Sequence, residues 1–256
     1  GGTHRHEKRR ASSPPSVMST LPPNWMQSLQ AGVQRMIDPN SSKTFRPRRQ
    51  AKAISRLDRL NTLAQRTLGT GNLQEAVTLP PGEDLNEWLA VKTLDLFNEV
   101  NLVYGFVSDF CTTTSCPVMC AALPDGSICH YAWADEQIKT PIQLPACEYV
   151  SHLFSWVQRL LDDESIFPTK PDAQFPSNFR QTISLIFRRL FRVYAHTYHN
   201  HYERMVALSF LPHLNTCFKH FMYFVFEFNL IKVEELAPLQ QLIDKLFQED
   251  KRKHKQ

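Results

Sequence analysis

The sequence predicts a mostly helical protein, and three observations support this fold class. Glycine is scarce and phenylalanine abundant, with 8 and 17 copies in 256 residues, while 42% of the residues are hydrophobic. Apolar and aromatic side chains recur at helical spacing over long stretches, above all in 178–202. Strand-like patterns are limited to two short runs, 118–122 and 127–133, on either side of an Asp125-Gly126 turn. We therefore expect one large helical domain that carries a small hairpin.

Start and stop signals place further helices along the chain. Asp84 can cap a long helix that continues to about Val107, because an aspartate side chain accepts hydrogen bonds from the first helical N–H groups. Asn178 begins the central helix. Pro212 lies in the first turn of a later helix, which is apolar on most sides and is therefore expected inside a bundle. This later helix is expected at 211–230, and further helices are expected at 55–68, 147–161 and 233–247.

The sequence shows no feature of a secreted or membrane protein. Nothing near the N-terminus looks like a signal peptide, and no stretch approaches the roughly 20 uncharged apolar residues needed to span a bilayer. The densest apolar stretch, 217–231, carries Lys219, His220 and Glu227. The six cysteines do not form the dense framework of a small secreted domain. We therefore expect a soluble intracellular protein whose cysteines are free or bound to metal.

Cysteine and histidine residues are spaced as in a structural zinc site. Cys111-x4-Cys116 lies at the loose end of the spacing range for zinc-binding cysteines, and His196-x4-His201 fits the range for histidines. On an ideal helix, however, positions 196 and 199 are about 60° apart, whereas 196 and 201 are about 140° apart, which favours His199. The ordinary alternatives are buried free thiols and histidines with other partners. The residues alone leave the choice of second histidine open.

Acidic and aromatic residues gather at the start of the helix that Asp84 caps. Glu83 and Glu87 lie where the helix dipole favours negative charge. Trp88 and Asp95 share a flank about 115° round from the apolar stripe. Two interpretations follow: a recognition surface for a basic partner segment, or an ordinary helix start whose tryptophan is buried in the core.

Three arginines precede the histidines on the central helix. Arg188, Arg192 and His196 are four residues apart and share a face, and Arg189 lies one position round. Fixed positive charges at this density need carboxylates or an anion to balance them. Guanidinium groups match phosphate oxygens in bidentate geometry. The cluster therefore indicates either salt bridges to acids elsewhere in the fold or a phosphopeptide site.

The sequence lacks the motifs of common enzyme classes: HExxH, H-x-E with P-C-x-x-C, a glycine-rich phosphate loop and G-x-S-x-G. A Cys2His2 set would fill a zinc tetrahedron and leave no position for water. We therefore expect no catalytic residues, with a zinc-dependent hydrolase as the enzyme alternative. The basic run 43–59 and the basic tail 251–256 raise nucleic-acid binding as another alternative, but such runs are more often solvated, so we expect no nucleic-acid partner.

Several motifs occur in the order that is typical of one protein family. They are KTFRP (43–47), LPPGEDLNEWLAV (79–91), CTTTSCPVM (111–119), YAWAD (131–135), DDESIFPTK (162–170), RRLFRVYAHTYHNH (188–201), HLNTCFKHF (213–221) and EFNLI (227–231) with ELAPL (235–239). With these motifs, residues 43–246 resemble the Mob family of non-catalytic activators of NDR/LATS-type kinases. The chain is most similar to the core class that acts in Hippo-type and mitotic-exit pathways.

The resemblance implies the all-α Mob/phocein fold, a four-helix bundle with flanking helices, a small β-hairpin and one structural Zn²⁺ ion. By position, the zinc ligands would be Cys111, Cys116, His196 and His201, which selects His201 over His199. This metal-ligand set would join the cysteine loop to the central helix.

The resemblance also implies two binding surfaces and a means of regulation. Arg188, Arg189 and Arg192, the arginine cluster, would bind a phosphorylated Hippo/MST-like upstream kinase or scaffold. The acidic surface for the basic N-terminal region of an NDR/LATS-type kinase would comprise Glu83, Glu87, Trp88, Val91 and Asp95. Thr44 and Thr67 match the threonines that upstream kinases phosphorylate. A Mob-like scaffold for a different kinase or phosphatase complex is the alternative within the family.

The chain is expected to have three parts. Residues 1–42 have the composition of a disordered or weakly ordered extension. Residues 43–250 would form the Mob domain and 251–256 a basic tail. We expect a cytoplasmic protein that also reaches the nucleus and the centrosome or spindle pole. Lys92, close to the acidic surface, departs from the family pattern and bears on the choice of partner.

Overall fold

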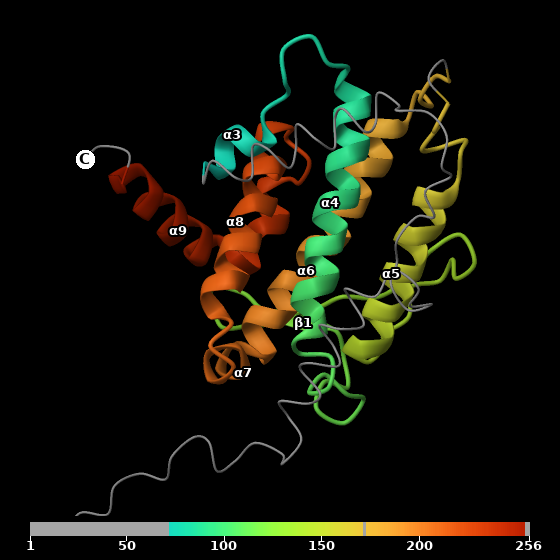
Figure 1. The fold of residues 1–256 in the computed structure, drawn as a ribbon. Coiled ribbons are helices and arrows are strands. Elements are labelled where there is room, and N and C mark those ends of the chain that lie inside the picture. The colour runs from blue at the N-terminus through green and yellow to red at the C-terminus, as the bar shows by residue number, and fades with distance from the viewer. Residues whose placement is uncertain (1–71, 171–172, 254–256) are drawn as a thin grey trace, which may run out of the picture.

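The computed structural model describes residues 72–170 and 173–253 (Figure 1). These ranges contain the central helix, the cysteine loop and the arginine cluster. Several predictions lie outside the described residues: the extension 1–42, the helix at 55–68, and the phosphorylation sites Thr44 and Thr67.

Long helices pack into the bundle that the sequence predicts. They are α4 (Leu85–Gly105), α5 (Ala146–Asp162), α6 (Phe179–Asn200) and α8 (Leu211–Glu227). In Figure 1, α6 lies behind α4, between α8 and α5, and it contacts both α4 and α5. Within 72–170 and 173–253, no helix combines the length and the apolar character needed to cross a bilayer. The predicted all-α fold around a central helix is confirmed.

Buried aromatic rings hold the bundle helices together. Phe187 of α6 stacks on Phe221 of α8, with ring centroids 5.2 Å apart. Phe97 of α4 meets Phe154 of α5 edge-on at 5.6 Å. A buried aromatic side chain removes about 150–250 Å² from water, so such contacts dominate the packing energy of the core. The central helix is therefore a rigid base for any group that it carries.

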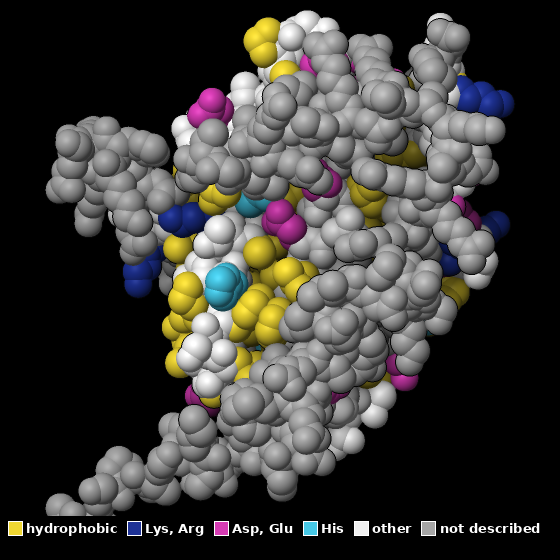
Figure 2. All heavy atoms as spheres, viewed as in Figure 1, with side chains coloured by type: hydrophobic (Ala, Val, Ile, Leu, Met, Phe, Trp, Pro, Cys, Tyr) yellow, Lys and Arg dark blue, Asp and Glu magenta, His cyan; other side chains and the backbone are white. Residues whose placement is uncertain are grey.

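Two short helices were not expected from the sequence. The helix α3 (Leu73–Val77) packs on α8, and α7 (Tyr202–Ala207) follows α6 directly. Both are too short to show helical periodicity. Met205 of α7 is buried while Tyr202 and Val206 are exposed, and hydrophobic side chains gather on the surface near α7 and the lower part of α8 (Figure 2).

The helix α8 ends earlier than the predicted boundary at 230. Its last residue is Glu227, and Asn229 adopts the left-handed conformation with φ of 48°. The N–H of Leu230 donates to the Val225 carbonyl at 3.0 Å, and the N–H of Asn229 donates to the Phe226 carbonyl at 3.3 Å. This pair of bonds is a Schellman cap, which an asparagine in the left-handed region supports. The cap directs the following segment back toward α6.

The prediction of one helix over 233–247 is wrong. The chain forms a 3-10 helix, η2 (Val233–Leu239), and then an α-helix, α9 (Gln240–Lys253). Pro238 lies at the junction and lacks the N–H that an α-helix interior requires. A continuous α-helix over 233–247 would place this proline in its interior, whereas the observed break leaves it two residues before α9 begins.

The predicted hairpin is present but shorter than expected. Strands β1 (Cys120–Ala122) and β2 (Ile128–His130) pair antiparallel, with Ala121 opposite Cys129, and β1 packs against α6. Gly126 has φ of 83° at the turn, which glycine adopts without steric cost. Beyond β2 the chain changes partner, because Trp133 pairs with Ile142 instead. The hairpin therefore joins a wider loop region beside the central helix.

The start of α4 is capped as the sequence predicts. The Asp84 carboxylate accepts hydrogen bonds from the N–H groups of Asn86 at 2.9 Å and Glu87 at 3.1 Å. These bonds satisfy two of the N–H groups that have no partner inside the helix. They fix the helix that carries the acidic surface.

Replacing the cap should weaken the fold without changing it. We expect Asp84→Ala to lower the free energy of unfolding by about 0.5–2 kcal/mol, because two helical N–H groups lose their acceptor. Asp84→Asn, which keeps a capping oxygen, should stay close to the wild type. Urea denaturation followed by circular dichroism measures both, and equal stability of the two variants would contradict the capping role.

Candidate metal centre and arginine cluster

The two cysteines of the metal-ligand set lie in a compact loop after α4. The N–H of Cys111 donates to the Val107 carbonyl at 2.8 Å, and the N–H of Cys116 donates to the Thr112 carbonyl at 2.9 Å. Ser115 Oγ accepts from the Thr112 N–H at 2.9 Å. Both thiols are buried. The loop backbone therefore presents two sulfur atoms to the interior in a fixed arrangement.

The two histidines come from the end of α6. His196 is buried in the helix, and His201 is the residue that follows its last residue, Asn200. The His201 backbone leaves the helical region, with φ of −126° and ψ of 11°, although its N–H still donates to Thr197. Because the helix ends here, the side chain of His201 can turn toward His196. His199, which geometry on an ideal helix favours, is exposed, and the structure groups His201 with His196 instead.

The four side chains meet at distances that suit a tetrahedral metal. Cys111 Sγ lies 3.6 Å from His196 Nε2, and Cys116 Sγ lies 3.5 Å from His201 Nε2. All four ligand atoms lie within 4.8 Å of one another. Zinc with bonds of about 2.3 Å to sulfur and about 2.0 Å to nitrogen places tetrahedral S and N ligands about 3.5 Å apart. The residues therefore fit a metal ion of this kind.

A hydrogen bond at Nδ1 of His196 would leave its Nε2 free to bind a metal. Its Nδ1 lies 3.0 Å from the Cys120 carbonyl of β1, and donation to that oxygen would leave the Nε2 lone pair directed at the set. Burial lowers the pKa of His196 to about 4, so the ring is neutral near pH 7. Burial also lowers the pKa of His201, with a smaller effect from Arg204.

The protonation state of the Cys111 thiol depends on whether a metal is bound. Burial raises the pKa of the Cys111 thiol to about 12, so without a metal this group is protonated near pH 7. A bound metal takes the thiolate and releases the proton. Four protein ligands would complete the coordination, which leaves no open position for the water that a zinc hydrolase needs. The set is therefore suited to a structural role.

The side chains of the arginine cluster have different partners. Arg188 Nη1 lies 3.3 Å from Glu235 Oε1. The guanidinium of Arg189 lies over the rings of Trp133 and Trp156, at 4.8 and 4.3 Å from their centroids, and Nη2 donates to the Ala134 carbonyl at 2.7 Å. Cation–π contacts of this kind hold an arginine in place without cancelling its charge.

Arg192 is held in a similar way on the next turn of α6. Its Nη1 donates to the Tyr149 hydroxyl at 2.8 Å, and its guanidinium lies 5.1 Å from the centroid of the Tyr131 ring. In the part of the chain that the structure describes, neither Arg189 nor Arg192 forms an ion pair with a carboxylate. Neutralisation by salt bridges therefore applies to Arg188 but not to the other two.

Two buried nitrogens of the cluster, Arg188 Nε and Arg189 Nη1, have no hydrogen-bond partner among residues 72–170 and 173–253. A buried donor without an acceptor costs about 1–3 kcal/mol, and burial lowers the pKa of Arg189 below its ordinary value. An anion that supplies oxygen atoms here would stabilise both groups. The aromatic residues that hold the cluster were missed because they are distant in sequence, although two of them lie in the YAWAD motif.

Two of the five residues assigned to the acidic surface are buried in the structure. Trp88 and Val91 are buried, and Trp88 Nε1 donates to the Val77 carbonyl at 2.9 Å. The interpretation with a core tryptophan is thus confirmed for this residue. Lys92 is also buried, with Nζ 5.0 Å from the centroid of the Trp88 ring. Burial lowers the pKa of Lys92 and raises the pKa of Asp95. The attraction between the two opposite charges acts against both shifts.

One polar pair in this region was not expected from the sequence. Glu99 Oε1 lies 2.8 Å from His220 Nδ1, which joins α4 to α8. Glu99 and His220 are 121 residues apart, so no local pattern could indicate the contact. An acidic residue of α4 therefore also forms a polar contact with another helix of the bundle.

Together, the fold and the candidate site define a class: a helical-bundle protein with a hairpin and a Cys2His2 set of structural type. Residues 65–239 match the model of the Mob1/phocein family, and the chain belongs to this family. The relatives bear the same family name. MOB kinase activator-like 1A of Arabidopsis thaliana is 52% identical over 207 residues, which cover 80% of this chain and 94% of that protein.

Similar proteins come from distant organisms. MOB kinase activator-like 1A of Medicago sativa subsp. falcata is 51% identical over 209 residues, which cover 81% of this chain and 95% of that protein. MOB kinase activator-like 1 homolog B of Dictyostelium discoideum is 49% identical over 213 residues, which cover 83% of this chain and 97% of that protein. The family resemblance predicted from the motifs is confirmed.

The choice of metal ligands can be tested with a pair of histidine variants. We expect His201→Ala to reduce bound metal and to lower the melting temperature by about 6–12 °C, which corresponds to about 3 kcal/mol in a domain of this size. The matched variant His199→Ala removes an exposed side chain of the same kind and should change neither property. Metal analysis by mass spectrometry and thermal unfolding give the two readouts.

A second pair of variants compares a proposed ligand cysteine with a cysteine outside the metal-ligand set. Cys111→Ser should behave like His201→Ala, whereas Cys129→Ser on β2 should resemble the wild type. Equal loss of metal and stability in a ligand variant and its matched control, or a wild type that is stable and free of metal, would rule out the assigned set.

Proposed function

We propose that this protein is a non-catalytic adaptor and co-activator of NDR/LATS-type serine/threonine kinases, stabilised by a structural Zn²⁺ ion. The observation that carries the proposal is the arginine cluster, because Arg189 and Arg192 contact rings and neutral oxygens and have no carboxylate partner among the described residues. The relatives add support, since their names describe kinase activator-like proteins.

The arginine cluster would bind a phosphorylated segment of a Hippo/MST-like upstream kinase or of a scaffold. A phosphoryl group carries a charge of about −1.5 to −2 near pH 7 and three acceptor oxygens. Arg188 Nε and Arg189 Nη1 are donors of the cluster that have no acceptor in the described part of the chain, and guanidinium pairs bind phosphate in bidentate geometry. Arg188 would exchange part of its contact with Glu235 for the phosphate.

The acidic surface would bind the basic N-terminal region of the effector kinase. Glu83, Glu87 and Asp95 would supply the negative charge. Trp88 and Val91 are buried, and they would support that surface from beneath by fixing α4 against the rest of the core. Rim charges of this kind mainly raise the association rate and select the partner.

Phosphorylation of Thr44 and Thr67 would regulate access to the acidic surface. The segment 43–59 is basic, so its charge is complementary to that surface and would compete with the kinase for it. A phosphate on each threonine would weaken this attraction and release the surface. Thr44 and Thr67 lie outside the described residues, so the support for this step is the charge pattern of the sequence.

The zinc ion would act as a cross-link. It would join the loop after α4 to the end of α6 through Cys111, Cys116, His196 and His201, whose distances suit a tetrahedral ion. The ion would bind the folded protein and not the unfolded chain, and this preference would stabilise the fold. The arginine cluster lies on the same helix, so the cross-link would keep it in position relative to the hairpin.

Phosphopeptide binding tests the first surface. We expect the wild type to bind a phosphothreonine peptide and to bind the unphosphorylated peptide at least about tenfold more weakly. The double variant Arg189→Gln with Arg192→Gln should lose at least about tenfold in affinity, since a charge-assisted hydrogen bond contributes about 1.5–3 kcal/mol. Arg204→Gln, on α7, is the matched control, and calorimetry gives the affinities. Equal affinities for the two peptides would refute the site.

A charge reversal tests the second surface. Glu87→Lys should weaken binding to a basic segment of an NDR/LATS-type kinase by about threefold to tenfold and should reduce the salt sensitivity of the complex, because less charge attraction remains to be screened. Glu148→Lys reverses an exposed acid in the first turn of α5 and should leave binding unchanged. Surface plasmon resonance measures both, with circular dichroism to show that the fold is intact. Unchanged binding by Glu87→Lys would remove the acidic surface from the proposal.

A further inference from the structure

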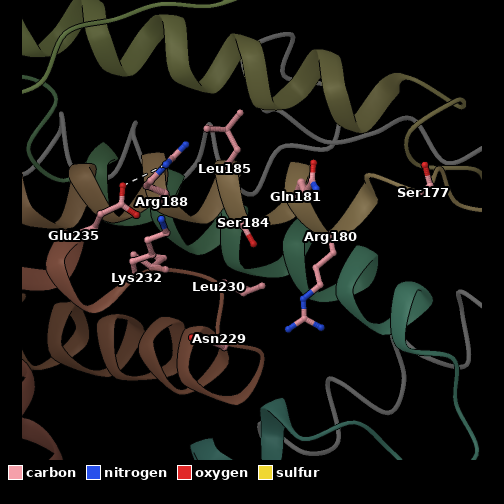
Figure 3. Close-up of a pocket in the computed structure, with 11 residues that line it drawn as sticks. Ser177, Arg180, Gln181, Ser184, Leu185, Arg188, Asn229, Leu230, Lys232 and Glu235 are labelled. Carbon is pink, nitrogen blue, oxygen red and sulfur yellow. Dashed lines mark hydrogen bonds and ion pairs between the residues drawn. The ribbon is translucent and has the colours of Figure 1, made fainter.

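A groove runs along the first half of α6, on the side that faces the segment after α8 (Figure 3). Its volume is about 630 Å³. It is lined by Ser177, Arg180, Gln181, Ser184, Leu185 and Arg188 of one wall, and by residues 229–232 and Glu235 of the other. Arg188 therefore belongs both to the groove and to the arginine cluster.

The two walls of the groove have a fixed spacing. Positions 181, 184, 185 and 188 repeat at three and four residues and form one face of α6. The opposite wall begins at the Schellman cap of α8, where Asn229 and Leu230 end the helix. Arg180 Nη2 donates to the Phe228 carbonyl at 2.7 Å and links the two walls. The groove is thus formed by backbone segments that are held in place without a ligand.

The charge of the groove is positive. Arg180, Arg188 and Lys232 contribute three positive charges, and Glu235 contributes one negative charge, so the lining carries a net charge of +2 (3 − 1). Arg188 pairs with Glu235, whereas Lys232 forms no ion pair within the described ranges. The first turn of α6 has no acidic residue, so the helix itself supplies no charge that offsets the positive end of its dipole. An acidic occupant is favoured.

The shape of the groove suits an extended chain. From Arg180 to Arg188 the helix rises about 12 Å, which equals the length of about four residues of extended peptide. Ser177, Gln181, Ser184 and Asn229 offer polar side chains along this path, and such groups bind peptide backbone. Figure 3 shows Arg188, Lys232 and Glu235 grouped toward one end and Arg180 toward the other. A single phosphate would occupy only a small part of this space.

We propose that this groove binds a short acidic segment of the same partner chain whose phosphate binds the arginine cluster. The inference rests on the proposed function, because Arg188 links the two sites. The partner would therefore be a phosphorylated peptide with about four acidic residues on one side of the phosphothreonine. The arginine cluster binds the phosphate. The groove binds the residues beside the phosphothreonine and so selects segments in which these residues are acidic.

The experiment compares phosphothreonine peptides with different flanks. Three peptides carry four glutamates before the phosphothreonine, four glutamates after it, or glutamines on both sides, and calorimetry measures their binding to the full chain. We expect one acidic flank to raise affinity by about threefold to tenfold over the neutral peptide, which is the scale of several exposed ion pairs. Equal affinity of all three peptides would overturn the groove while leaving the phosphate site intact.

A charge variant assigns that difference to the groove. Lys232→Glu should abolish the advantage of the acidic flank and leave the affinity of the neutral phosphopeptide unchanged. Lys245→Glu, an exposed lysine on α9, should keep the advantage. If Lys232→Glu weakens both peptides equally, the groove does not read the flank.

Two further outcomes are decisive. Failure of the neutral phosphopeptide to bind, with no difference from its unphosphorylated form, would overturn the arginine cluster site and this inference together. Displacement of the acidic peptide by a single-stranded oligonucleotide that binds more tightly and depends on Lys232 would overturn the assignment to a peptide.

Discussion

The end of α6 at Asn200 is the constraint on which the rest of the structure depends. In a continuing helix, His201 would point about 140° away from His196. Because the helix stops, His201 lies beside Cys116, with Sγ and Nε2 3.5 Å apart. The cysteine loop, the hairpin and the central helix then meet at one buried point. The arginines on the same helix are thereby placed against the residues of 131–134 and of α5 that contact them.

Most of the fold could be predicted from the sequence, because its signals are local. Long periodic stretches indicate the bundle helices, and Asp84 marks the start of α4 by its capping chemistry alone. The 3-10 helix at Pro238 shows the limit, since periodicity continues through a proline that the α-helix cannot accept. The end of α8 at Glu227 was missed for a similar reason, because Asn229 gives the stop signal inside an apolar run.

The candidate site could be predicted only in part, because its contacts are not local. Spacing selected two cysteines and His196, which the structure groups together, but the choice of His201 depended on where the helix ends and came from the family resemblance. The partners of the arginines were not predictable. Trp133 and Trp156 lie far from Arg189 in sequence, and no pattern along one helix indicates which rings will cover it. The burial of Trp88 is likewise a tertiary effect.

The rings that hold Arg189 have a consequence for the speed and the discrimination of binding. A free arginine side chain loses about 2 kcal/mol of rotamer entropy when it is fixed. Here Trp133 and Trp156 restrict the guanidinium while the protein is unbound, so that entropy is lost during folding rather than during recognition. In the proposed phosphate site, Arg189 would therefore act as a rigid template, and an anion whose oxygens do not match its geometry could not recruit the side chain by moving it.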